Sequence, residues 1–298
     1  MNIFIQGMRR SGTTIAFDVL LEDGRFDCYY EPLADASGEA RGGGSGVHAE
    51  DFFEKIRATR KRFIEERCPL DDHRLLNHGA PREPALEFET TLPQHVADYI
   101  RFMCAQAQDT VIKFTRMACK VHVLHGIDPQ AKFVHVVRDP RAVVTSHLYG
   151  RDQVSQSSFE GSDEFFTRRT RKTRWASLAF SEALLQRPEY AHLEGLHDFE
   201  RVLLVWKHLA RATHDGAITH FPDRHHILRH DDLIRDQEGS LRAMYRALDL
   251  EPSPAAMTWA RQHVRGSVRI HDPDHPAWSD AFRRLDLHRE LADLGFEP

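Results

Sequence analysis

The residues best suited to chemistry lie in a glycine-bounded loop near the start of the chain, Gly7-Met8-Arg9-Arg10-Ser11-Gly12-Thr13-Thr14. The glycine spacing is that of the phosphate loop GxxxxGKS/T, and the loop stands between an apolar run and a helical pattern, as that motif requires. Glycines let the backbone curl so that successive N–H groups and the helix N-terminus face an anion. Thr13 and Thr14 can add hydroxyl donors. The pattern predicts an anion site, and the alternative is an ordinary strand-to-helix turn.

One position in this loop argues against the usual nucleotide chemistry. Thr13 stands where a P-loop nucleotide hydrolase carries the lysine that bridges the β- and γ-phosphates. Without that lysine, and with Arg10 earlier in the loop, the site suits an anion but is poorly suited to cleaving a triphosphate with magnesium. Two alternatives stay open: a P-loop kinase or nucleotide hydrolase with an altered lysine position, and a nucleotide-binding module without turnover.

The loop resembles one family closely. Ile5 to Thr14 is similar to the 5′-phosphosulfate loop of sulfotransferases that use 3′-phosphoadenosine 5′-phosphosulfate (PAPS). Cytosolic members carry a lysine before Ser-Gly-Thr-Thr, whereas tyrosylprotein sulfotransferases carry an arginine there, as this chain does with Arg10. The resemblance implies PAPS as co-substrate, no metal, and transfer of a sulfuryl group to a hydroxyl.

A second segment, Lys132 to Ser146, resembles the part of these enzymes that binds the 3′-phosphate of PAPS. An arginine at a strand end and a serine eight residues later contact that phosphate in the family, and here they are Arg138 and Ser146. The spacing is physically sensible, because a strand end and the second turn of the next helix can converge on one anion. The alternative is an Arg-Asp-Pro turn that caps a helix.

The resemblance also implies catalytic roles. Sulfuryl transfer is an in-line displacement that needs a stabilised leaving oxygen and a base for the acceptor proton. Arg10, whose pKa exceeds about 12, would act on the leaving oxygen through charge alone. Lys113 matches a family lysine that touches the sulfuryl group. Cytosolic phenol-sulfating members place a histidine base two residues later, where this chain has Thr115; tyrosylprotein sulfotransferases use a glutamate that corresponds here to Glu31.

Other signals are weaker. Family members often close the nucleotide with an Arg-Lys-Gly loop, for which Arg265-Gly266-Ser267 is the nearest candidate, without the lysine. The basic run 168–174 suggests a solvated helix face or a dock for an anionic acceptor, and the glycine-rich stretch 37–46 a passive loop or a mobile lid. A metal site at His271 to His275 is not expected, since no ligand pair supports it. The expected nucleotide contacts are Arg9, Arg10, Ser11, Gly12, Thr13, Thr14, Arg138, Ser146, Arg265 and Gly266.

The elements that must position these residues alternate between short β-branched runs and longer amphipathic ones, which is typical of an α/β fold. Strands are expected at 3–5, 26–30, 110–114, 132–137 and 226–229. Helices are expected at 13–21, 51–67, 93–107, 163–186, 199–221, 240–249 and 255–264. We predict a single domain over 1–298 with a P-loop-like three-layer fold, in which helices flank a central parallel sheet.

Composition limits the partners. With 40 Lys+Arg against 45 Asp+Glu, the net charge of −5 gives no positive field for nucleic acid, so any anion must be held locally. No targeting pattern and no run of 18 apolar residues is present, and the four cysteines form no CxxC pair, so a cytoplasmic protein without membrane contact is expected. The acceptor could be a small molecule, a sugar or a carrier-bound hydroxyl compound, and homodimerisation stays open.

Overall fold

The structure is a computed structural model that describes residues 1–33, 49–67, 83–149, 162–170, 176–264, 266 and 268–296. The glycine-rich stretch 37–46, most of the basic run 168–174, and Arg265 lie outside the described residues. In the part that is described, no helix is both long and apolar enough to cross a bilayer.

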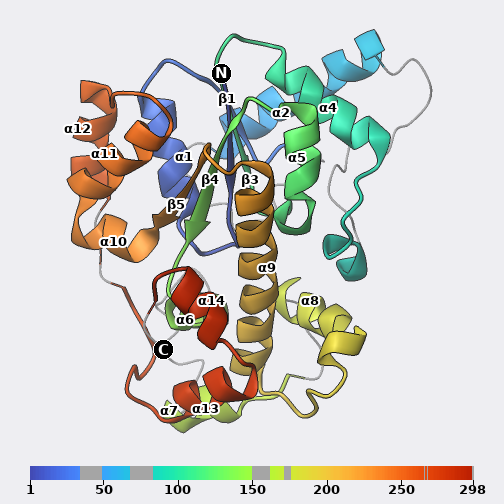
Figure 1. Cartoon of the computed structure of the whole chain (residues 1–298), viewed down its shortest axis with the longest axis vertical. Coiled ribbons are helices and arrows are strands. Elements are labelled where there is room, and N and C mark those ends of the chain that lie inside the picture. The colour runs from blue at the N-terminus through green and yellow to red at the C-terminus, as the bar shows by residue number, and fades with distance from the viewer. Residues whose placement is uncertain are drawn as a thin grey trace.

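A five-stranded parallel sheet forms the centre of the molecule (Figure 1). Its strands are β1 (Asn2–Gln6), β2 (Asp27–Tyr30), β3 (Thr110–Phe114), β4 (Lys132–Val137) and β5 (His225–Arg229). They lie in the order β2-β3-β1-β4-β5, and every neighbouring pair is parallel. All five expected strands are confirmed. Because the chain passes to opposite sides of β1 through β3 and β4, the loop after β1 lies where ligands bind in open α/β sheets.

Helices cover both faces of this sheet. Successive strand residues point to opposite faces, so Ile3 and Ile5 pack in one core cluster and Phe4 in another. The first cluster includes α1 (Thr13–Glu22), α11 (Gln237–Ala247) and α12 (Pro254–His263). The second includes α4 (Gln94–Cys104), α5 (Val121–Ile127) and the end of α9 (Asp198–His220). The expected three-layer α/β arrangement is therefore confirmed.

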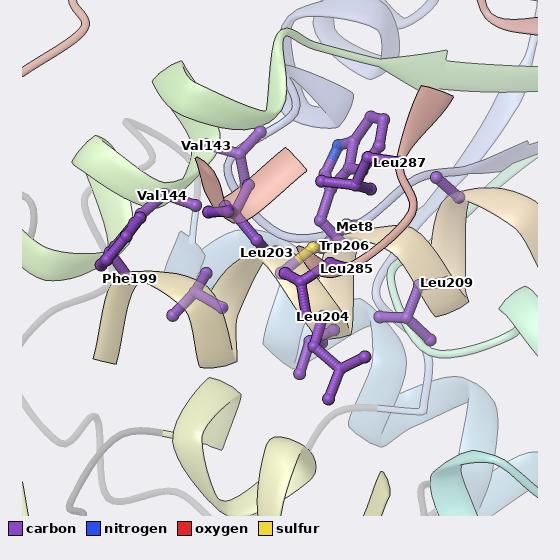
Figure 2. Close-up of a cluster of buried hydrophobic side chains, with 14 of the residues drawn as sticks. Met8, Val143, Val144, Phe199, Leu203, Leu204, Trp206, Leu209, Leu285 and Leu287 are labelled. Carbon is purple, nitrogen blue, oxygen red and sulfur yellow. The ribbon is translucent and has the colours of Figure 1, made fainter. Parts of the chain in front are cut away.

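A third apolar cluster extends past the carboxyl ends of the strands, in the lower half of Figure 1. It joins α6 (Pro140–Tyr149), α7 (Ser162–Thr167), α8 (Ala176–Leu185), α13 (Ala277–Arg284) and α14 (His288–Asp293) to the first half of α9. Figure 2 shows Met8, from the phosphate loop, next to Trp206 of α9 in this cluster. Met8 thus anchors the phosphate loop to this apolar cluster.

The smaller elements complete the described chain. They are α2 (Ala49–Arg67), the short 3-10 helices η1 (Pro84–Glu87), η2 (Ala118–Lys120) and η4 (Pro188–Tyr190), and α10 (His230–Arg235). The start of α10 is held against the β4–α6 turn, because the Asp139 backbone N–H donates to Asp231 Oδ2 at 2.9 Å.

The single helix expected over 163–186 is wrong. Helix α7 ends at Thr167, and residues 168–170 are not helical, so Arg168 and Arg169 do not lie on a helix. Asp198, at the start of α9, competes for the backbone here. Its N–H donates to the Arg168 carbonyl at 2.9 Å, and its carboxylate accepts from the Thr170 N–H at 3.0 Å. These bonds replace the ones that would continue the helix.

Several histidines are enclosed in the fold and resist protonation. Burial lowers the pKa of His135, on β4, to about 3. Burial also lowers the pKa to about 4 at four other positions: His147, His208, His226 and His230. An unfolded histidine has a pKa of about 6.5, so the unfolded chain binds more protons than the native one between pH 6.5 and 4. Native stability must fall as the pH is lowered through that window.

We expect unfolding at pH 5 to take up roughly four to five protons, about 0.9 from each of these five histidines. The urea midpoint measured by circular dichroism should decrease from pH 7 to pH 5. His135→Phe, which keeps a buried ring, should reduce the proton uptake by about one. A midpoint that is constant from pH 7 to pH 5 would contradict this account.

Candidate functional site

The phosphate loop follows β1 and turns sharply into α1, with Gly12 as the N-cap residue at φ 90°. Only glycine adopts this conformation readily. A Cβ at Gly12 would lie 2.4 Å from His230 Cδ2, and a Cβ at Gly7 would lie 2.4 Å from the Val136 carbonyl oxygen. The loop therefore requires glycine at both positions. The first N–H groups of a helix have no partner within it, so the N-terminus of α1 can bind an anion.

Two successive carbonyls of the loop are held by the segment that follows β4. His147 Nε2 lies 3.2 Å from the Arg9 oxygen, and Arg138 Nη1 donates to the Arg10 oxygen at 3.3 Å. A carbonyl only accepts, so the Nε2 atom of His147 carries the proton. Burial, and then the charge of Arg10, keep this imidazole neutral by lowering its pKa to about 4. Since C=O and N–H point opposite ways in a trans peptide, anchoring the Arg9 carbonyl also orients the Arg10 N–H.

Arg138 and His230 lie beside the loop with unused polar atoms. Burial lowers the pKa of both side chains, and the Arg138 charge lowers that of His230 further. The Nε of Arg138 and the Nδ1 of His230 are buried without a hydrogen-bond partner among the described residues. Buried polar atoms are normally satisfied, so these two indicate a place for a polar ligand. Ser146 lies on α6, partly buried, and no hydrogen bond joins it to Arg138 within the described chain.

The two predicted catalytic residues of the neighbouring strands contact each other directly. Lys113 Nζ donates to Glu31 Oε1 at 2.5 Å, and Thr115 Oγ1 donates to Glu31 Oε2 at 3.0 Å. The Lys113 side chain is 3% exposed and that of Glu31 is 18% exposed. The pairing follows from the sheet, where Tyr30 and Lys113 are in register at the ends of β2 and β3. Thr115 and Lys113 thus each donate to one oxygen of the Glu31 carboxylate.

Tyr30 connects this pair to the phosphate loop. Its hydroxyl lies 3.1 Å from Thr14 Oγ1, in the first turn of α1, and its ring lies under Lys113 Nζ, 4.1 Å from the centroid. An ammonium group over an aromatic face is attracted by the ring quadrupole. The loop and the Glu31–Lys113 pair are therefore parts of one site at the carboxyl edge of the sheet.

Backbone strain coincides with this site. Five described non-glycine residues have positive φ, and three of them are aspartates, which tolerate that region. The other two are Arg10, at φ 72°, and Glu31, at φ 47°. Such conformations cost free energy and cluster at active sites. Glu31 is held in place on both sides, because its N–H donates to the Lys113 carbonyl at 3.0 Å and Arg60 donates to the carbonyl of Pro32.

Among the remaining candidates, Gly266, His271 and His275 are described. Gly266 has φ 138°, and a Cβ there would meet open space. His271 stacks on Phe165 at 4.2 Å between centroids, and His275 stacks on Phe166 at 4.0 Å. These two histidines pack the C-terminal segment against α7. Within the described chain, no cluster of three or more His, Cys, Asp or Glu could hold a metal ion.

Comparison with known proteins identifies the family. The model described as "Sulfotransferase family" matches residues 2–192, which is more than half of the 298 residues. The chain belongs to the sulfotransferase family. The resemblance seen in its phosphate loop is thereby confirmed.

Curated relatives include the omega-hydroxy-beta-dihydromenaquinone-9 sulfotransferases Stf3 of Mycobacterium bovis (strain ATCC BAA-935 / AF2122/97) and Mycobacterium tuberculosis (strain CDC 1551 / Oshkosh). Each is 25% identical over 287 residues, covering 88% of this chain and 66% of the relative. This chain thus spans slightly less than two thirds of their length.

Among solved structures, the sulfotransferase domain of the curacin biosynthetic pathway has a TM-score of 0.49 and 15% identity, over 99% of this chain and 97% of that one. Sulfotransferase STF9 from Mycobacterium avium has a TM-score of 0.49 and 13% identity, over 99% and 77%.

Two residues of this sulfotransferase site have no signal in the sequence. His147 lies one residue past the end of the Arg138–Ser146 motif, and His230 directly follows the strand expected at 226–229. Their role depends on packing between distant segments, since His147 meets Arg9 and His230 meets Gly12. Neither contact can be predicted from sequence spacing alone.

The glycine requirement gives a matched test. Gly12→Ala should destabilise the protein and remove nucleotide binding, because the new methyl group meets His230 in addition to the strain of positive φ. Gly24→Ala is the control: its φ is 79°, and a Cβ there has open space. It should cost only the conformational term of about 1–2 kcal/mol. Thermal unfolding and titration with a nucleotide distinguish the two variants. Equal effects of Gly12→Ala and Gly24→Ala would contradict the close packing of His230 on the loop.

Proposed function

We propose that this protein is a PAPS-dependent sulfotransferase that transfers a sulfuryl group to an acceptor hydroxyl. The observation that carries the proposal is the Glu31–Lys113–Thr115 arrangement next to a phosphate loop that lacks the hydrolase lysine. Membership of the sulfotransferase family supports it. A triphosphate-cleaving enzyme would need the missing lysine and a magnesium site.

The residues around the loop fit a phosphosulfate nucleotide. The loop amides, with Ser11, Thr13 and Thr14, would hold the 5′-phosphosulfate, and Arg9 would add charge from the exposed side of the loop. Arg138, with Ser146 on the following helix, would hold the 3′-phosphate, and the unused Nε of Arg138 supports this assignment. Arg265 and Gly266 would contact the adenine and 3′-phosphate end of the nucleotide.

The acceptor oxygen would form a bond to sulfur with its lone pair, while the bond from sulfur to the phosphate oxygen breaks and its electron pair leaves with the phosphate. Glu31 would take the acceptor proton. Its carboxylate uses one acceptor position for Lys113 and one for Thr115, which leaves further lone pairs for the acceptor hydroxyl. Lys113 would stabilise charge on the sulfuryl oxygens, and Arg10 the leaving oxygen.

Ligand binding separates this proposal from the alternatives. We expect 3′-phosphoadenosine 5′-phosphate, the product nucleotide, to raise the melting temperature without magnesium, and Mg-ATP not to do so. Stabilisation by Mg-ATP alone would favour a kinase or hydrolase. Binding of the product nucleotide without any transfer of sulfate would favour a non-catalytic nucleotide-binding module.

Replacing the proposed base tests the mechanism. Glu31→Gln should lower kcat for sulfate transfer by about 100- to 10,000-fold, the usual contribution of a general base, while product-nucleotide binding persists. Asp27→Asn is the control, because Asp27 pairs with Lys55 at the opposite end of the same strand. It should keep near-normal kcat. A Glu31→Gln variant with unchanged kcat would remove Glu31 from the mechanism.

A further inference from the structure

A pocket opens between the phosphate loop and the helices beyond the carboxyl edge of the sheet. The space between its lining residues is about 430 Å³, a volume that includes open solvent. The polar side chains of its lining are Arg9, Thr115, Arg116 and His147, and the apolar ones are Met8, Phe180, Val205 and Leu209. The pocket therefore draws on the loop, on the segment after β3, and on α6, α8 and α9.

Thr115 places one part of this pocket at the proposed reaction centre. Its Oγ1 donates to Glu31 Oε2 at 3.0 Å, so a molecule that reaches Thr115 is next to the proposed base. Met8 and Arg9 belong to the loop proposed to hold the donor. A hydroxyl that enters here meets both the base and the donor side of the site, as an in-line transfer requires.

Four of the eight lining residues are apolar. Val205 and Leu209 are buried on α9, and Met8 is buried in the same cluster, in which Figure 2 labels Met8 and Leu209. Phe180, on α8, is partly exposed and contributes an aromatic wall. Because Met8, Val205 and Leu209 are at most 7% exposed, Phe180 offers most of the apolar surface that a ligand can reach. Covering that surface with an apolar ligand removes nonpolar area from water and is favourable.

Most of the polar lining groups already have partners. The Arg116 guanidinium donates to the buried carboxylate of Glu87 at 2.7 Å, and the Nε2 of His147 is used by the Arg9 carbonyl. Thr115 uses its donor on Glu31. No carboxylate is among the residues that line the pocket. A sugar or peptide would lose its hydrogen bonds to water here without replacing them, at a cost in free energy.

We propose that the pocket binds the acceptor, and that the acceptor is an uncharged, predominantly apolar molecule with a terminal hydroxyl. Its apolar end packs against Phe180 and the stretch of α9 that carries Val205 and Leu209, and its hydroxyl lies at Thr115 and Glu31. This inference rests on the proposed sulfotransferase function and specifies the acceptor class that the family alone leaves open.

Primary alcohols of increasing length test the proposal with labelled PAPS. From 1-butanol to 1-octanol, kcat/KM should rise by roughly fourfold per methylene group until the pocket is filled, because each buried methylene contributes that factor. Glucose and a serine-containing peptide should give no detectable product. Efficient sulfation of either polar acceptor, or no dependence on alcohol length, would overturn the proposal.

Substitutions of the pocket residues test whether the acceptor binds in this pocket. Leu209→Trp should lower kcat/KM for 1-octanol at least tenfold, and Phe180→Ala, at a partly exposed position, should flatten the chain-length dependence. Ile218→Trp is the control, since Ile218 lies on the same helix and is 47% exposed. All three should keep the melting-temperature rise caused by the product nucleotide. Equal kcat/KM for 1-octanol in Leu209→Trp, Phe180→Ala and Ile218→Trp would place the acceptor elsewhere.

A binding measurement separates this proposal from the proposed function. With product nucleotide present, 1-octanol should raise the melting temperature further, and glucose should not. If the nucleotide stabilises the protein but 1-octanol neither stabilises it nor is sulfated, the pocket proposal is wrong while donor binding stands. If the nucleotide does not bind and no acceptor is sulfated, the proposed function itself fails.

Discussion

The position of β1 between β3 and β4 in a parallel sheet is the constraint on which the site depends. Gln6, the last residue of β1, is in register with Phe114 on one side and with His135 on the other. Whatever follows these strands must share one edge. The phosphate loop follows Gln6, Thr115 follows Phe114, and Arg138 follows Val137. Because these strands are adjacent and parallel, the residues that follow them lie close together even though the phosphate loop is more than 100 positions from Thr115 and Arg138 in the chain.

The charge of the site differs from what a count of its arginines and lysines suggests. Arg9, Arg10, Lys113 and Arg138 are four cations in a chain of net charge −5, which explains how an acidic protein can offer a local anion site. The ammonium of Lys113, however, is paired with Glu31. When the proposed base takes up a proton, that compensation ends, and the full charge of Lys113 becomes available. In the proposed mechanism, proton acceptance by Glu31 and stabilisation of the sulfuryl oxygens by Lys113 are thus linked through one ion pair.

Much of this arrangement could be predicted from the sequence, because it depends on local patterns. The five strands have clear apolar runs, and the loop has a fixed glycine spacing. The adjacency of Glu31 and Lys113 follows once both are placed at strand ends. The break in the helix expected over 163–186 could not be predicted, because Asp198, from a later element, takes its backbone bonds. A single domain over 1–298 stays a prediction, and Arg265 lies outside the described residues.

The contacts that sequence spacing missed have a common physical character. His147 and His230 reach the loop from segments that follow other strands, and burial keeps both of them neutral. A protonated histidine at either position would add a cation next to Arg10 or Arg138 and would oppose the charges already there. A neutral imidazole instead holds the Arg9 carbonyl and fills the space in front of Gly12. The neutral histidines therefore support the strained conformation at Arg10, and the positive charges of Arg10 and Arg138 stay available to an anionic ligand.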